Sequence, residues 1–235
     1  MLLVLVAAAG GAVVLATRDD GTASGGADYA PDIDPARFTA QVDNPFLPLP
    51  PGARWVYDGT TADGAEHTVV EVQAGTKKIM GVDCVIVRDT VSLDGQVVED
   101  TYDWFAQDDE GNVWYFGEDT KEYEEGAVAS TAGSWEAGVD GAQPGIAMEA
   151  KPKAGDRYRQ EYYRGEAEDM GEVLGVDERV DVPFGHFDGV LKTKDTTPLE
   201  PDVVEHKYYA SGIGLVLELD PTGGSERVEL TDFQQ

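Results

Sequence analysis

Aromatic rings and carboxylates follow one another closely in the stretch from Glu99 to Gly126. Rings with a few polar neighbours are typical of small-molecule pockets. On an extended strand, Tyr102 and Trp104 fall on one face, whereas Asp103 and Phe105 fall on the other. Both faces therefore carry rings, and we expect both to be covered. The rings expected to line a ligand cavity, if they do not simply fill a core, are Trp104, Trp114, Trp135, Tyr158, Tyr162, Tyr163 and Tyr208.

Three acidic segments offer the carboxylate and amide oxygens that calcium takes as ligands. None matches the spacing of an EF-hand loop, because the twelfth position counted from Asp108 is Asp119. Two interpretations stay open, a calcium site or ordinary acidic turns, and Ca²⁺ is the one cofactor that we consider. The candidate ligands are Asp108, Asp109 and Asn112, then Glu118 and Asp119, and then Glu166, Glu168 and Asp169.

Catalytic motifs are sparse. Ser134 lies in Ala-Gly-Ser-Trp-Glu, which lacks the second glycine of a nucleophile elbow. Glu161 and Glu205 lie on predicted strands among tyrosines, where burial can raise the pKa of a carboxyl group towards that of a general acid. Ion pairs with Arg157, Arg159 or Lys207 are the simpler interpretation of both. With His206, these glutamates are the candidate catalytic residues.

Cys84 is the only cysteine, which excludes an internal disulfide and a thiolate metal cluster. Its neighbours, Val82 to Val87, have the composition of a strand. We expect a buried, unreactive thiol.

The charge balance restricts the partners. The chain carries 46 acidic and 17 basic residues, a formal net charge of −29. Nucleic acid and an anionic membrane surface are therefore excluded, because each phosphate contact needs Lys or Arg. The hydrophobic fraction of 41% is that of a folded protein.

The N-terminal residues predict export. Residues 1–16 are apolar or small, a length typical of a signal-peptide core and short for a membrane span. We expect residues 1–17 to be a signal peptide or signal anchor, residues 18–43 to be a linker with a short helix, and residues 44–235 to be a single β domain. Asp34 and Pro35 provide the cap and first residue of that helix, over Ala36 to Val42. The predicted location is secreted or extracytoplasmic.

Turn signals divide the chain into about eleven strands with no long helical period. Asp63-Gly64 and Asp94-Gly95 predict tight hairpins, and the cluster Asp108 to Asn112 joins two central strands. The proline-dense segment Asn44 to Gly52 is expected to lie across the sheet as a lid or edge. We expect Gly133 to Gly145 to be an irregular loop. The predicted fold is all-β, a curved antiparallel sheet or partly open barrel.

Two motifs resemble a group of uncharacterised secreted bacterial β-sheet proteins. They are the proline-rich opening with Trp55-Val56-Tyr57, and the closing pair Lys207-Tyr208-Tyr209-Ala210-Ser211-Gly212-Ile213-Gly214-Leu215-Val216. The resemblance covers Asn44 to Val216 and implies an exported protein with a curved antiparallel sheet. A looser resemblance to half-barrel lipoprotein carriers implies an apolar ligand.

We therefore predict an exported binding or envelope-associated module with an aromatic-lined, acidic concave face that takes a small apolar or saccharide ligand. A carboxylate-dependent or calcium-dependent extracellular hydrolase is the alternative. A third interpretation is a structural surface protein whose charge keeps it soluble in salt.

Overall fold

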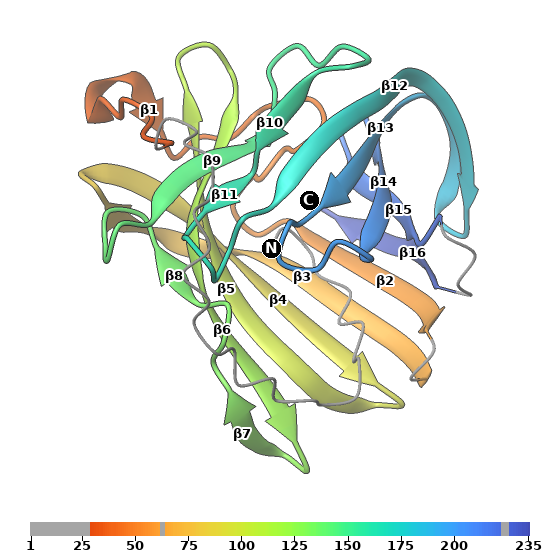
Figure 1. Ribbon diagram of the computed structural model, residues 1–235. Coiled ribbons are helices and arrows are strands. Elements are labelled where there is room, and N and C mark those ends of the chain that lie inside the picture. The colour runs from red at the N-terminus through yellow and green to blue at the C-terminus, as the bar shows by residue number, and fades with distance from the viewer. Residues whose placement is uncertain (1–28, 62–63, 222–225) are drawn as a thin grey trace.

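The computed structural model describes residues 29–61, 64–221 and 226–235, which form an antiparallel all-β barrel (Figure 1). Thirteen of its sixteen strands follow one path in the order β10-β12-β13-β14-β15-β16-β2-β3-β4-β5-β6-β9-β11, and β1, β7 and β8 pair beside it. The strands are β1 (Phe38–Thr39), β2 (Arg54–Thr61), β3 (Gly64–Ile79), β4 (Val82–Leu93), β5 (Gln96–Asp108), β6 (Val113–Glu124), β7 (Ala127–Ser130), β8 (Trp135–Glu136), β9 (Gln143–Met148), β10 (Arg157–Arg159), β11 (Glu161–Tyr162), β12 (Met170–Val182), β13 (Gly185–Thr196), β14 (Val204–Ala210), β15 (Gly214–Leu219) and β16 (Arg227–Gln234).

One bent segment nearly closes the sheet. The two ends of the strand path, β10 and β11, are consecutive in the chain and separated only by Gln160. β10 pairs with β12, and β11 pairs with β9. Close approach is possible because Gly145 has no side chain, whereas a Cβ there would meet the backbone of Arg159 and Gln160. The sheet therefore curves into a nearly closed barrel that encloses an interior.

The central pair that the sequence predicts is present. β5 and β6 are hydrogen-bonded neighbours joined by the turn at Asp108 to Asn112. The hairpin between β4 and β5 turns at Asp94 and Gly95, with φ angles of 48° and 79°. Two successive residues with positive φ are the mark of a two-residue turn whose twist matches that of the strands. The other predicted hairpin, Asp63-Gly64, falls partly outside the described residues.

The proline-dense segment covers one end of the barrel, as expected. The amide of Gly212 donates to the carbonyl of Pro45 at 2.7 Å, and that of Gly52 donates to Val72. Buried Asn44 donates from Nδ2 to the carbonyls of Gly111 and Glu149, and its Oδ1 accepts from the amide of Phe46. Side-chain hydrogen bonds thus hold a segment whose prolines cannot join the ladder.

Three expectations need correction. Asp34 caps a turn that starts at Pro35, but this is a three-residue 3₁₀ turn, η1 (Pro35–Arg37), rather than a helix to Val42. The chain becomes extended at Phe38 because it pairs there with β5. The segment from Gly133 to Gly145 is not an irregular loop throughout, since β8 pairs with β6 and β9 begins at Gln143. The count of about eleven strands is too low, because short strands lack turn signals of their own.

Cys84 is buried, as predicted. Burial, followed by the nearby charge of Asp83, raises the pKa of its thiol to about 12. The thiol is therefore protonated at neutral pH, which makes it a poor nucleophile.

The predicted signal segment 1–17 lies outside the described residues. Among the residues that are described, no helix is long and apolar enough to cross a membrane.

Candidate functional site

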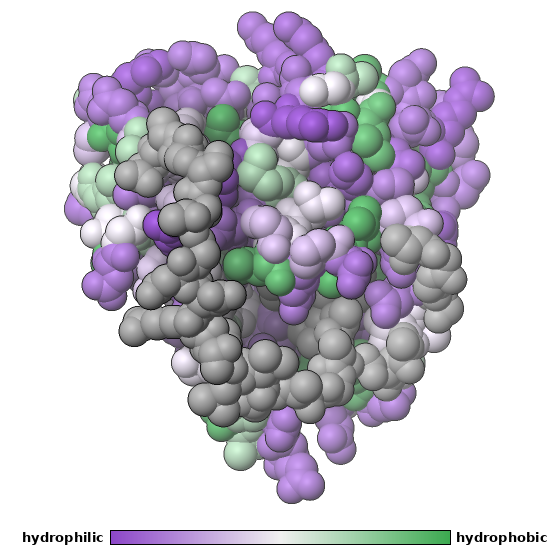
Figure 2. Space-filling model, viewed as in Figure 1, coloured by the Kyte–Doolittle hydropathy of each residue, from purple (hydrophilic) through white to green (hydrophobic). Residues whose placement is uncertain are grey.

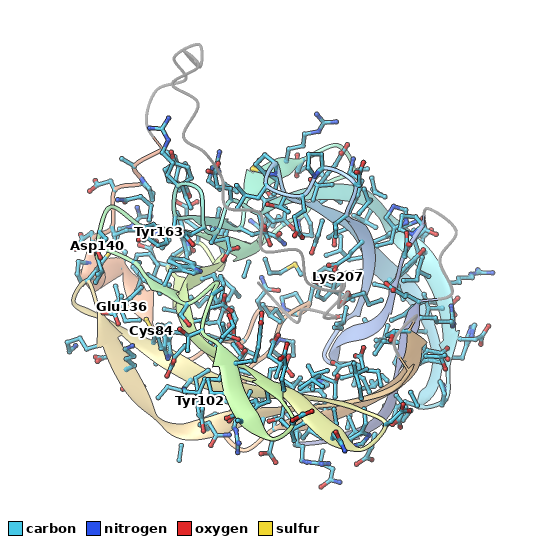
Figure 3. All side chains as sticks on the ribbon, turned by 60° about the horizontal axis from the view of Figure 1, so that its bottom comes forward. Cys84, Tyr102, Glu136, Asp140, Tyr163 and Lys207 are labelled. Carbon is cyan, nitrogen blue, oxygen red and sulfur yellow. The ribbon has the colours of Figure 1, made fainter. Side chains whose placement is uncertain are left out.

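The barrel interior holds a cluster of carboxyl groups. Along β5, Glu99, Thr101 and Asp103 are buried, and the residues between them are more exposed. Cross-strand pairing brings Asp89 of β4 opposite Thr101, and Glu118 of β6 opposite Asp103. Because side chains of paired residues lie on the same face of a sheet, all these groups point inwards. In Figure 3, Lys207 points into the barrel from another wall.

A small cavity lies between these carboxyls and the proline-dense segment. Its volume is about 40 Å³. Most of its wall is aromatic or aliphatic, and only Asp89 and Asp103 bring acidic groups to it. The lining side chains come from β2, β3, β4, β5, β14 and β15 and from the covering segment, namely Leu47, Pro48, Leu49, Trp55, Tyr57, Val70, Val87, Phe105, Tyr209 and Leu215.

Asp89 is the exceptional residue of this cavity. Its side chain is buried, with a residue exposure of 5%, and Oδ1 accepts no hydrogen bond from the described residues. Burial raises the pKa of Asp89 well above its usual value, and the negative charges of Asp103, Glu99 and Glu66 raise it further. Both effects favour the neutral acid form of Asp89 over the carboxylate.

Tyr115 links two other interior carboxyls. Its hydroxyl lies 2.6 Å from Oδ1 of Asp103 and 2.9 Å from Oε2 of Glu118. One hydroxyl donates a single proton, so a protonated carboxyl is the natural second donor. Burial raises the pKa of Asp103 to about 6 and raises the pKa of Glu118 well above its usual value.

The opposite wall carries an ion cluster around Lys207. Its Nζ lies 3.2 Å from Asp195, 3.1 Å from Glu205 and 3.9 Å from Glu218. Burial alone would lower the pKa of Lys207, but these carboxylates outweigh it and keep the pKa well above its usual value. Lys207 is thus a buried, charged group surrounded by acids.

The predicted ligand-binding rings are dispersed. Trp135 and Tyr158 are buried beside interior acids, and the indole of Trp135 donates to Glu161 at 2.8 Å. The others lie elsewhere. Nζ of Lys77 lies 3.2 Å from the centre of the Trp104 ring, and the Trp114 indole donates to Asp108. Tyr162 packs edge to face against Tyr29 and lies beneath the guanidinium of Arg159. Tyr208 contacts Lys192, and Tyr163 forms an isolated bridge with Ala167.

The predicted calcium ligands are not brought together. Asp108 accepts four hydrogen bonds from its own turn and from Trp114, and Asp109 pairs with Arg37. Glu118 points inwards, whereas its neighbour Asp119 is exposed beside Lys121. In the third segment, Glu168 accepts from the amide of Gly165, and Glu166 and Asp169 complete a surface turn. No group of three or more His, Cys, Asp or Glu in the described ranges has the arrangement of a metal site.

The two glutamates among the catalytic candidates lie in the barrel, and besides burial the charge of Asp169 contributes to raising the pKa of both. Glu161 is buried against Trp135, and burial raises its pKa. Glu205 pairs with Lys207, and burial raises its pKa although Lys207 opposes the shift. His206 points away from both, and partial burial with nearby Lys192 and Lys194 lowers its pKa.

Sequence analysis missed most of the interior acids. Their signal is the alternation Glu99-x-Thr101-x-Asp103-x-Phe105, which places polar groups in phase with a core ring. Because alternate residues of a strand lie on one face, this pattern predicts inward-facing acids once it is known which face packs against the core. The missed residues that shape the cavity and its surroundings are Tyr57, Glu66, Asp89, Glu99, Asp103, Tyr115, Lys207, Tyr209 and Glu218.

No protein-family model matches the chain, and no curated protein matches it. Among solved structures, it is similar to the crystal structure of a protein described as a "putative lipoprotein" from Parabacteroides distasonis. The two share 13% sequence identity over 80% of this chain and 98% of that chain, with a TM-score of 0.42. A likeness at this level carries no functional argument, so we argue the function from the barrel interior.

Proposed function

We propose that the protein is an exported binding module that holds a small ligand inside its barrel. The apolar N-terminal residues support export. The observation that carries the binding function is the cavity beside Asp89, where an apolar wall meets a buried carboxyl oxygen with no partner among the described residues.

Such an arrangement is costly for a protein that only needs to be stable. An unpartnered buried polar group costs about 1 to 3 kcal/mol. Perturbed carboxyls in a cavity are typical of functional sites, where a ligand supplies the missing hydrogen bond. An interior built only for stability would place an apolar side chain at position 89.

Thermal unfolding with a ligand library tests this function. The library contains apolar compounds, saccharides and organic cations. A ligand at 100 times its dissociation constant adds about 2.7 kcal/mol to the free energy of unfolding, which is a clear rise in Tm. Val87→Leu adds one methylene to the cavity wall and is expected to abolish the rise, whereas Val128→Leu adds the same group on exposed β7 and leaves it intact.

Val70→Ile is a second cavity variant for the case in which Val87→Leu does not fold. A library that produces no rise in Tm contradicts the proposal. An equal rise in the wild type and in both cavity variants also contradicts it, because the ligand would then bind outside the barrel.

A further inference from the structure

We propose that the ligand is an organic ammonium ion whose positive charge is taken by Asp89 and Asp103. This inference rests on the proposed function and adds the chemical class of the ligand. It is argued from the charge balance of the interior, the shape of the cavity and the state of Asp89.

The charged groups that raise the pKa of Asp89 are all negative, namely Asp103, Glu99, Glu66 and Asp100. Among the described residues, the buried charged side chains comprise eight carboxyl groups and one amine. Desolvated carboxyls resist ionisation unless protons or a cation balance them. The eight are Glu66, Asp89, Glu99, Asp103, Glu118, Glu161, Asp195 and Glu218, and the amine is that of Lys207.

Basic residues on the strands around Asp89 are engaged on the outer face. Arg54 pairs with Glu71, Lys77 with Glu136, and Arg88 with Asp100. All three basic side chains are at least one-third exposed. Lys207 lies on the opposite wall, tied to its own acids. A positive group for Asp89 is therefore best supplied by a ligand.

The cavity suits an alkylammonium group better than a sugar or a metal ion. Its volume of about 40 Å³ accommodates only a few heavy atoms, so a linear chain can insert one ammonium end with its first methylenes, whereas a sugar ring is too wide. Rings of Trp55, Tyr57, Phe105 and Tyr209 line it. Aromatic faces attract ammonium groups by cation–π interaction, and aliphatic walls accept an alkyl chain. The described residues show no metal-binding group of three acids, histidines or cysteines.

Binding must displace a proton. Burial and the neighbouring carboxyls favour the neutral acid form of Asp89 before the ligand arrives. On binding, its O–H bond breaks, the proton passes to the buffer, and the carboxylate accepts a hydrogen bond from an N–H of the ammonium group. The ligand keeps all its protons. Affinity therefore rises with pH until Asp89 is ionised in the unliganded protein, and each binding event releases up to one proton. A neutral ligand would leave the proton in place.

Isothermal titration calorimetry with 1,4-diaminobutane provides the test. The neutral isostere, 1,4-butanediol, serves as the matched probe, and two buffers of different ionisation enthalpy report the proton released. We expect saturable binding of the diamine, proton release, and no detectable binding of the diol. Asp89→Asn keeps the shape of the neutral acid but cannot ionise, so it is expected to fold and to lose about 10- to 100-fold in affinity, the range of a charge-assisted hydrogen bond.

Asp83→Asn is the control, because Asp83 is on the same strand but pairs with Lys78 at the surface. It is expected to bind the diamine as the wild type does. Asp103→Asn replaces Asp89→Asn if the latter does not fold, as judged by its unfolding transition.

Several results would overturn the inference. These are equal affinity for diol and diamine, unchanged affinity in the folded Asp89→Asn or Asp103→Asn variant, binding without proton release, and no binding of the diamine. Each leaves the proposed binding function standing if the library screen has found a cavity ligand of another class. Failure of the screen removes the binding function itself.

Discussion

Buried carboxyls determine how single residues contribute to stability in this barrel. Glu99 is representative, because burial raises its pKa to about 7, from an ordinary value of 4.5. The folded protein therefore holds a proton that the unfolded chain has lost between these two pH values. The free energy of unfolding falls as pH rises through this window and levels off above it. The usual carboxylate, paired in the native state, has the opposite effect.

The variant Glu99→Gln tests whether Glu99 makes the free energy of unfolding fall as pH rises. The amide resembles the neutral acid and retains the bond that Thr101 donates to Oε1. At pH 8 we expect the variant to be more stable than the wild type by about 1 to 3 kcal/mol, whereas near pH 4.5 the two should be equal. Urea unfolding at both pH values measures the difference.

Glu71→Gln is the matched control, since Glu71 lies on the outer face with its side chain 44% exposed. It should change stability by less than about 0.5 kcal/mol at either pH. An equal effect of Glu99→Gln at pH 4.5 and pH 8 would show that Glu99 does not titrate as proposed.

At the scale of elements, the covering segment positions the cavity. Leu47, Pro48 and Leu49 form one of its walls, and Asn44 fastens the segment through three side-chain hydrogen bonds. We expect Asn44→Ala to lower the free energy of unfolding by about 2 to 4 kcal/mol, because it leaves buried backbone groups unpaired. Gln41→Ala, on an exposed residue three positions before Asn44, should have little effect. Equal urea midpoints for the two variants would contradict this account.

Many of the strands and turns were predictable from the sequence. The hairpin at Asp94-Gly95 and the pair of strands around Asp108 to Asn112 follow from local turn chemistry, and the structure confirms both. The strand at Trp135–Glu136 was missed, because two residues carry no periodicity and pair only through tertiary contact with β6. The helix after Pro35 was overpredicted, because pairing with β5 prevails over a favourable cap.

The site was less predictable than the fold. Trp135 and Glu161 were both singled out by sequence, and the structure brings them together. Asp89 was not singled out, although it sits in an alternating strand, because sequence cannot say which face of a strand is inside until the barrel is known. Lys207 was considered only as a possible ion-pair partner, and its position among three acids depends on strands far apart in the chain.

The whole molecule carries acids both outside and inside. The face in Figure 2 is largely hydrophilic with scattered hydrophobic residues, as expected for a chain of net charge −29. A strongly negative surface attracts cations and raises their local concentration near the barrel. The buried carboxyls then form a second, desolvated layer in which charge interactions are stronger than in water. The surface and the interior thus both favour a positively charged ligand.

The protonation state of Asp89, with and without a bound amine, shows whether this carboxyl receives the positive charge of a ligand. Carbon-detected NMR of side-chain carboxyls, with Asp89→Asn to assign the resonance, follows this group from pH 4 to pH 9 with and without 1,4-diaminobutane. We predict a neutral acid at pH 7 in the unliganded protein, because burial raises its pKa well above the usual value, and a carboxylate after the diamine binds. Titration near the ordinary Asp value, with no response to the diamine, would contradict the account.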